Sequence, residues 1–232
     1  NDLGHRVGQS EHWWDSFEGG LDYILEPSGI KWQDFKQMDF IRGPVNYRKY
    51  QERGFSTPTK KFELYSTLLE NWGYDPLPKF REPPESPVSM PERHEQFPYI
   101  LITGARSPGF FHTENRQVPW LRELHKDPVV EIHPRTAEKE GIKEGQWVII
   151  ESVRGKVRQR AKIFGGIHPK VVGAQHAWWF PENKDPGHGW DESNINILTD
   201  NAYDACDPAM GATSVRTLLC NIYPESSRQS KY

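Results

Sequence analysis

Polar and basic side chains follow apolar segments at three places in the second half of this sequence. The first is TGARSPGFFHTENR, residues 103–116, which combines glycines with hydroxyl, guanidinium and imidazole groups. Glycine exposes backbone N–H groups and arginine offers a planar fork of donors, so this composition suits phosphate binding. The competing interpretation is a polar surface loop in which Arg106 has no special role.

The two other segments carry rings and amides. Residues 173–182 run from a predicted strand end into an aromatic cluster that contains Trp178. Such a cluster either packs in the core or forms a wall for a flat heterocycle, with His176 at its edge. Residues 192–199 place Asn194 and Asn196 at alternate positions. Their amides suit the edge of a heterocycle, although an asparagine-rich turn has the same composition.

Common catalytic and metal-binding motifs are absent from the sequence. It contains no GxSxG, HExxH, GxxxxGK[ST] or GxGxxG pattern. None of the nine histidines forms a convincing metal-ligand pair, so the spacing predicts no protein-liganded metal site and assigns no catalytic residue. Cys206 and Cys220 lack a CxxC spacing. We interpret them as two thiols, with a disulfide as the alternative.

Short strands and turns must position these segments. Strands are predicted at residues 99–103, 128–133, 147–152, 156–163, 169–173 and 218–223, with a short helix between Pro134 and Gly141 and a tight turn at Arg154-Gly155. In residues 156–163, apolar side chains share one face with Gln159, whereas basic side chains occupy the other. The pattern predicts a small, mainly β barrel or sandwich with short helices.

The first part of the chain has a different character. Residues 1–96 are rich in Trp, Pro and charge, and helical patterns cover Trp13–Leu25 and Thr59–Trp72. Seven prolines in residues 74–98 argue against regular structure there. We therefore expect an irregular, partly helical extension over 1–96 that belongs to upstream domains, a barrel over 97–225 and a C-terminal tail over 226–232.

Charge and hydropathy restrict the function classes. The formal net charge of the 232 residues is −3, and the basic residues are spread along the chain, which argues against nucleic acid as the main partner. No apolar stretch approaches the length of a membrane span.

Residues 97–225 resemble the C-terminal dinucleotide-binding domain of the molybdopterin oxidoreductases, the dimethyl-sulfoxide reductase family. The matching segments occur in the family's order: TGARSPGFFHTENRQ, DPVVEIHPRTAEKEGIKEGQWVIIESVRGKVRQRAKI, GIHPKVVGAQHAWWFPE, SNINILTD and VRTLLCNIY. Upstream, STPTKKFELYSTLLENWGYDPLPKFREP resembles the branch that includes thiosulfate and polysulfide reductases and acetylene hydratase.

The resemblance implies a double-psi β-barrel, the aspartate-decarboxylase-like fold, and a bis(molybdopterin guanine dinucleotide) cofactor carrying molybdenum or tungsten. It implies cofactor contacts, to pterin or diphosphate groups in the first loop, at Thr103, Gly104, Arg106, His112, Thr113, His176, Trp178, Asn196 and Arg216. Family members often carry Arg where Ala105 stands, so one donor is missing here.

By this resemblance the chain is the cofactor-binding part of an oxidoreductase that transfers electrons or an oxygen or sulfur atom. The alternatives are a non-redox hydratase, a hydroxyl-transferring or dehydroxylating enzyme with the same cofactor, or a stand-alone cofactor-binding module. The expected partners are the rest of the catalytic subunit, which would carry any iron–sulfur cluster, and an iron–sulfur electron-transfer subunit. The compartment stays open between the prokaryotic cytoplasm and the periplasmic face of the cell envelope.

Overall fold

The computed structural model describes residues 1–207 and 209–225, so the predicted tail over 226–232 lies outside the described residues. It divides the chain into two compact units, Asn1–Glu63 and Leu64–Tyr232. This division falls upstream of the predicted boundary at residue 96, because residues 64–96 group with the barrel.

The first unit consists of short helices. These are α1 (Asp2–Arg6), η1 (Ser10–His12), α2 (Phe17–Leu25), η2 (Glu26–Ser28), α3 (Trp32–Phe35) and α4 (Tyr50–Arg53). Helix α2 begins after Ser16, whose hydroxyl accepts a hydrogen bond from the N–H of Gly19 at 3.0 Å. This N-cap explains why the predicted helix from Trp13 starts four residues later, at Phe17.

The second unit opens with two short helices, α5 (Thr67–Asn71) and α6 (Pro91–Gln96). The prediction of a helix over Thr59–Trp72 is wrong for most of its length. The apolar residues that suggested it, such as Phe62 and Leu68, remain exposed. A short helix gains little without an apolar face to bury. The prediction that residues 74–98 lack regular structure is also wrong at α6, where Pro91 occupies the first turn, a position that tolerates proline.

Six strands form a closed barrel in the order β1-β5-β2-β4-β3-β6. They are β1 (Tyr99–Ala105), β2 (Val129–Ile132), β3 (Trp147–Ser152), β4 (Gly155–Ile163), β5 (Val171–Gln175) and β6 (Leu218–Pro224). The pairs β1–β5 and β2–β4 are parallel, and the other four pairs are antiparallel. The mainly β prediction is confirmed, and the barrel is correct rather than the sandwich.

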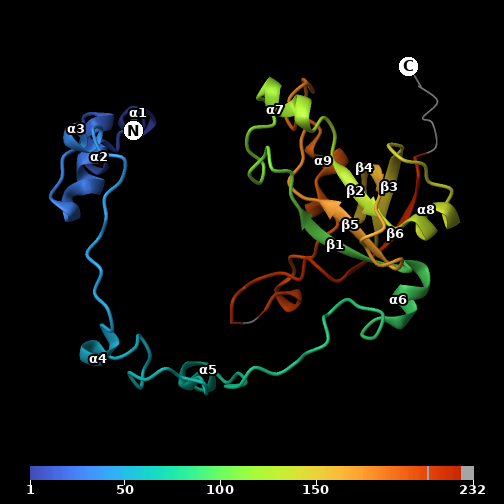
Figure 1. Ribbon diagram of the computed structural model, residues 1–232, viewed down its shortest axis with the longest axis horizontal. Coiled ribbons are helices and arrows are strands. Elements are labelled where there is room, and N and C mark those ends of the chain that lie inside the picture. The colour runs from blue at the N-terminus through green and yellow to red at the C-terminus, as the bar shows by residue number, and fades with distance from the viewer. Residues whose placement is uncertain (208, 226–232) are drawn as a thin grey trace. The chain divides into compact units, whose positions relative to one another are not determined.

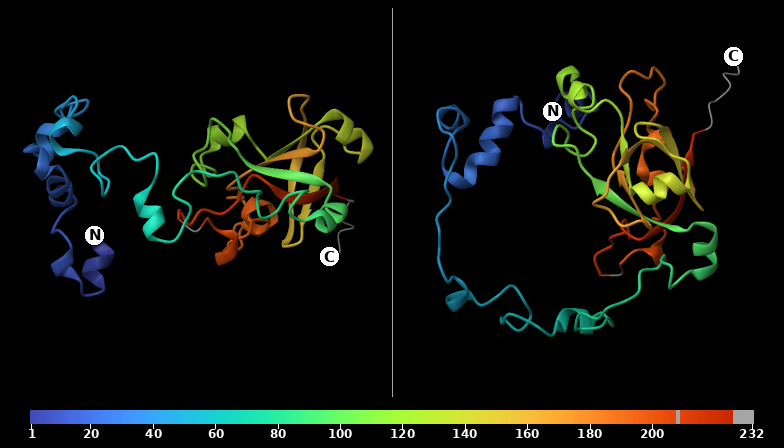
Figure 2. Two further views of the ribbon diagram at one scale, coloured as in Figure 1. Left: turned by 90° about the horizontal axis from the view of Figure 1, so that it is seen from below. Right: turned by 45° about the vertical axis from the view of Figure 1, so that its right-hand side comes forward.

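Short helices cover the barrel. They are α7 (Pro119–Leu124), α8 (Pro134–Lys139), α9 (Trp190–Ser193), η3 (Ile195–Ile197) and η4 (Tyr203–Ala205). Helices α7 and α8 lie at opposite ends of the barrel (Figures 1 and 2). No helix in the part of the chain that the structure describes is long and apolar enough to cross a membrane.

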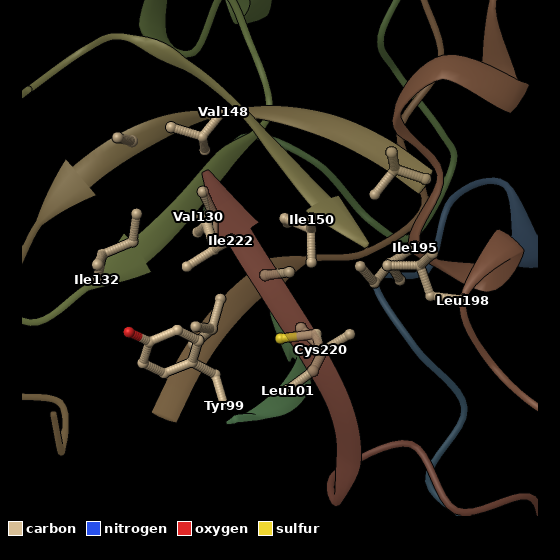
Figure 3. Close-up of a cluster of buried hydrophobic side chains, with 14 of the residues drawn as sticks. Tyr99, Leu101, Val130, Ile132, Val148, Ile150, Ile195, Leu198, Cys220 and Ile222 are labelled. Carbon is tan, nitrogen blue, oxygen red and sulfur yellow. The ribbon is translucent and has the colours of Figure 1, made fainter. Parts of the chain in front are cut away.

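Alternate residues of the strands point into the barrel (Figure 3). Among them, Leu101, Ile150 and Cys220 are fully buried. Gln159 is buried on the same face, as its position in the strand pattern predicts, and its amide donates hydrogen bonds to the carbonyls of Gln175 and Ser193. Cys206 and Cys220 are free thiols, in agreement with the preferred interpretation.

Candidate functional site

The strand directions bring three of the predicted segments to one end of the barrel. Because β1 and β5 are parallel, both finish there, at Ala105 and Gln175. Strand β6 runs antiparallel to β1 and begins at the same end. The backbone N–H and the hydroxyl of Thr103 both donate to the carbonyl of Val215, at 3.1 and 2.8 Å. Thr103, His176 and Arg216 therefore lie on segments that leave the barrel together.

The segment that carries Asn196 reaches the same end. The turn between β3 and β4 lies there because β3 is antiparallel to β6. Arg154, in this turn, donates to the carbonyl of Leu198 at 3.4 Å. Ile195 and Leu198 are fully buried at one side of the core (Figure 3). They anchor η3 and leave Asn196 exposed between them.

Gly104 interrupts the end of β1. The pairing with β5 shifts register between Thr103 and Ala105, and Gly104 adopts a φ of 104°, which side-chain-bearing residues rarely adopt. A Cβ atom at Gly104 would find nothing within 4 Å. The backbone is therefore open to a ligand at this bulge.

Two arginines at this end have no ion-pair partner among the described residues. Arg106 and Arg216 are both exposed, and neither makes a hydrogen bond or ion pair with another residue of the described ranges. Their guanidinium groups are free to bind an anion. A nearby cavity of about 380 Å³ also contains an arginine, Arg154. The charge of Arg154 is already paired, because the side chain contacts Glu85 and Asp200 at 2.6 and 2.8 Å.

His112 and His176 meet at the loop ends. Nδ1 of His176 lies 3.3 Å from the carbonyl oxygen of Ala105, and Nε2 lies 3.2 Å from Nδ1 of His112. A carbonyl only accepts, so Nδ1 of neutral His176 carries the proton and its Nε2 accepts from His112. Burial lowers the pKa of His176, and its hydrogen bond to Ala105 only partly opposes this. His176 is therefore neutral near pH 7. Its two hydrogen bonds, to Ala105 and to His112, fix the orientation of the ring.

The other predicted residues differ in accessibility. Thr113 is exposed, and its carbonyl accepts a hydrogen bond from Nε1 of Trp179 at 2.7 Å. Trp178 is fully buried and packs with Phe110 and Phe180. The structure thus favours the core interpretation of this ring over the heterocycle wall, because a ligand cannot stack on a ring that other side chains cover.

Sequence reasoning missed Arg116. It ends the first polar segment, yet its side chain is 1% exposed and donates hydrogen bonds to the carbonyls of His112 and Ala177, at 2.8 and 3.0 Å. It thereby ties the loop after β1 to the loop after β5. The only signal in the sequence was its place within the polar segment, which does not distinguish an exposed arginine from a buried one.

The donors at this end fit an anionic ligand with ring systems. Free guanidinium groups suit phosphate, and the open backbone at Gly104 allows close approach. The amide of Asn196 and Nε2 of His112 are also available for hydrogen bonding, whereas both ring nitrogens of His176 are occupied. Among the described residues, no group of three or more His, Cys, Asp or Glu is placed to hold a metal ion.

Comparisons with known proteins agree with this chemistry. The family model described as "Molydopterin dinucleotide binding domain" matches residues 99–218. The dopamine dehydroxylase of Eggerthella lenta is 41% identical over 183 residues, covering 77% of this chain and 18% of that protein. The thiosulfate reductase molybdopterin-containing subunit of Salmonella typhimurium is 33% identical over 158 residues, covering 67% of this chain and 20% of its own length.

A solved structure matches nearly the whole chain. The acetylene hydratase from Pelobacter acetylenicus superposes with a TM-score of 0.84 and 29% identity, covering 96% of this chain and 32% of that one. The chain spans less than a third of the length of each relative and structure named here. The family model covers more than half of the residues of the chain, and on that basis the chain belongs to the molybdopterin dinucleotide-binding domain family.

Proposed function

We propose that the loop-bearing end of the barrel holds one part of a bis(molybdopterin guanine dinucleotide) cofactor in a larger molybdenum or tungsten enzyme. The observation that carries this proposal is the presence of two uncommitted guanidinium groups, Arg106 and Arg216, at the end of a barrel whose sequence matches the family. The parallel pairs β1–β5 and β2–β4 support a double-psi crossing of the strands.

Different residues would contact different parts of the cofactor. Arg106 and Arg216 would bind diphosphate oxygens, and the Gly104 backbone would approach them closely. The hydroxyl of Thr113 would add a donor. The hydroxyl of Thr103 already donates to the carbonyl of Val215, and Nδ1 of His112 donates to His176, so these two groups would offer acceptors. Asn196 would direct its amide edge toward a heterocycle. His176, whose two ring nitrogens contact Ala105 and His112, would hold His112 in place. Trp178 would act from the core, by supporting the loop that begins at His176.

When bound, the cofactor supplies a metal centre for electron transfer or for transfer of an oxygen or sulfur atom. The residues of this chain would bind and orient the cofactor and place donors around it. We propose that residues 1–96 belong with the domains around it, and that any iron–sulfur cluster and electron-transfer partner lie in the rest of the enzyme or a separate subunit.

The reaction class has one specific alternative. The similarity to a dopamine dehydroxylase favours reductive removal of a hydroxyl group, whereas the similarity to acetylene hydratase favours addition of water without net redox change. The full-length enzyme would separate them. Turnover of a catechol with a low-potential electron donor supports reduction, whereas turnover of an alkyne without an added donor supports hydration.

The cofactor proposal is tested on the full-length protein purified without oxygen. We expect molybdenum or tungsten and about two pterin dinucleotides per chain. Replacing Arg106 and Arg216 together by Gln should lower the bound pterin by roughly tenfold or more, because two charge-assisted hydrogen-bond donors are lost. A folded wild-type protein that contains neither metal nor pterin would overturn the proposal.

A further inference from the structure

The two loops at the candidate site are joined by one buried guanidinium group. Nη2 of Arg116 donates to the carbonyl of His112, in the loop after β1, and to the carbonyl of Ala177, in the loop after β5. Nη1 lies 3.4 Å from the carbonyl of Glu114. A single side chain therefore fixes both loops through their backbones.

The two principal carbonyls belong to strained residues. His112 has a φ of 48° and Ala177 a φ of 60°, in the left-handed region that costs free energy for residues other than glycine. Such conformations persist where the surroundings hold them. The hydrogen bonds from Arg116 provide that support, and His176 lies directly before one of these residues.

The charge of Arg116 has no acidic partner. The guanidinium carbon lies 4.2 and 4.5 Å from the ring centroids of Phe110 and Trp178, and no ion pair to Arg116 exists among the described residues. Its neighbour Arg122 pairs with Glu182 at 2.8 Å. Burial, and to a lesser degree Arg122, lowers the pKa of Arg116 to about 10, so it stays charged near pH 7. Its positive charge also acts on His176.

A buried cation without a counter-ion is costly in free energy, and aromatic faces offset only part of that cost. An anion bound at the same end of the barrel would offset more of it. Building on the proposed function, we propose that Arg116 is a positioning residue of the cofactor site. It holds the two loops together through their carbonyls, and its positive charge, which has no acidic partner among the described residues, is compensated by the anionic cofactor.

The test uses the full-length protein, produced in a host that makes the pterin dinucleotide and in a matched host that does not. The variants are Arg116→Gln, which removes the charge but keeps a donor, and Arg116→Lys, which keeps the charge but loses the planar fork. Arg122→Gln is the matched control, because it makes the same change at a neighbouring arginine whose charge is already paired. Three quantities are measured: bound pterin, the unfolding midpoint of both forms, and amide hydrogen exchange.

We expect Arg116→Gln to retain roughly tenfold less pterin than wild type or lower, while Arg122→Gln stays within about twofold of wild type. Arg116→Lys should retain more pterin than Arg116→Gln, because the charge remains. In the cofactor-free protein, exchange should quicken in residues 106–116 and 176–180 of both Arg116 variants and stay unchanged in the barrel strands. This pattern separates positioning from general stabilisation.

Two results would overturn the inference. One is wild-type pterin content in Arg116→Gln. The other is an equal loss in both Arg116 variants together with equal falls in the unfolding midpoint of the cofactor-free and loaded forms, which indicates a purely structural role. If Arg116→Gln does not fold, the test uses Arg116→Lys. Amide hydrogen exchange at the wild-type rate in both loops of that variant would refute the positioning role. Wild-type protein without pterin instead refutes the proposed function.

Discussion

The two units of this chain are held together in different ways. In Leu64–Tyr232, strands distant in sequence pair around a core in which side chains such as Leu101 and Ile150 are fully buried. In Asn1–Glu63, aromatic rings pack mainly with near neighbours in sequence, as in the stacked pair Tyr50–Phe55, and many stay exposed. The barrel unit can therefore define the geometry of the site, whereas the first unit lacks a comparable core of its own.

The largest effect that tests this comparison should come from the core. Ile150→Ala is expected to lower the free energy of unfolding by about 2–5 kcal/mol, because it leaves a cavity in the barrel. Phe17→Ala removes a larger side chain that is 70% exposed, and we expect it to change the free energy of unfolding by less than about 0.5 kcal/mol. Urea unfolding of the chain measures both. Equal losses would mean that the first unit has a core of similar quality.

An intermediate effect should come from Glu85, in the stretch between the first unit and β1. Its buried carboxylate accepts hydrogen bonds from Arg154 at 2.6 Å and from the N–H of Leu219 at 2.7 Å. Glu85→Ala leaves both donors without this acceptor, so we expect a loss of about 1–3 kcal/mol in the same unfolding assay. Glu92→Ala, at an exposed carboxylate on α6, is the control. If Glu85→Ala does not change the free energy of unfolding, the contacts of Glu85 do not stabilise the attachment of this stretch to the barrel.

The smallest effect should be a pH dependence within the site. Burial lowers the pKa of His176 in the folded state below its ordinary value of 6.5. Below about pH 6.5 the unfolded chain therefore binds more protons than the folded one, and stability falls as the pH drops. His176→Asn should reduce this acid slope by less than about 1.4 kcal/mol per pH unit, the limit for one proton. Urea midpoints between pH 5 and 7.5 measure it, and an unchanged slope would contradict it.

The barrel was the more predictable unit because its strands alternate clearly. Residues 147–152 form a strand as predicted, and the buried face of residues 156–163 contains Val157, Gln159 and Ala161, as the alternation indicated. The strand predicted at 169–173 begins and ends two residues later, at Val171 and Gln175. The β3–β4 turn contains Val153-Arg154 rather than Arg154-Gly155, because Gly155 pairs with Ser152.

The site was predictable in its residue types and not in its arrangement. The polar segments could be identified because glycine, arginine and asparagine follow apolar strands. The order of the strands, which brings Thr103 next to Val215, depends on pairings between distant residues that no local pattern records. The role of Arg116 depends on burial between two rings, and a sequence pattern gives no measure of that.

The barrel order also dictates when this protein can fold. Within the described residues, strand β1 pairs with β5 and β6, whose pairing residues begin about 70 and 115 positions later in the chain. During synthesis on the ribosome, the backbone N–H and C=O groups on both edges of β1 therefore have no strand partner until β5 and β6 have been made. We therefore expect the barrel to close late in folding, and we expect a ligand that needs the loops after β1 and β5 in their final arrangement to bind only after that closure.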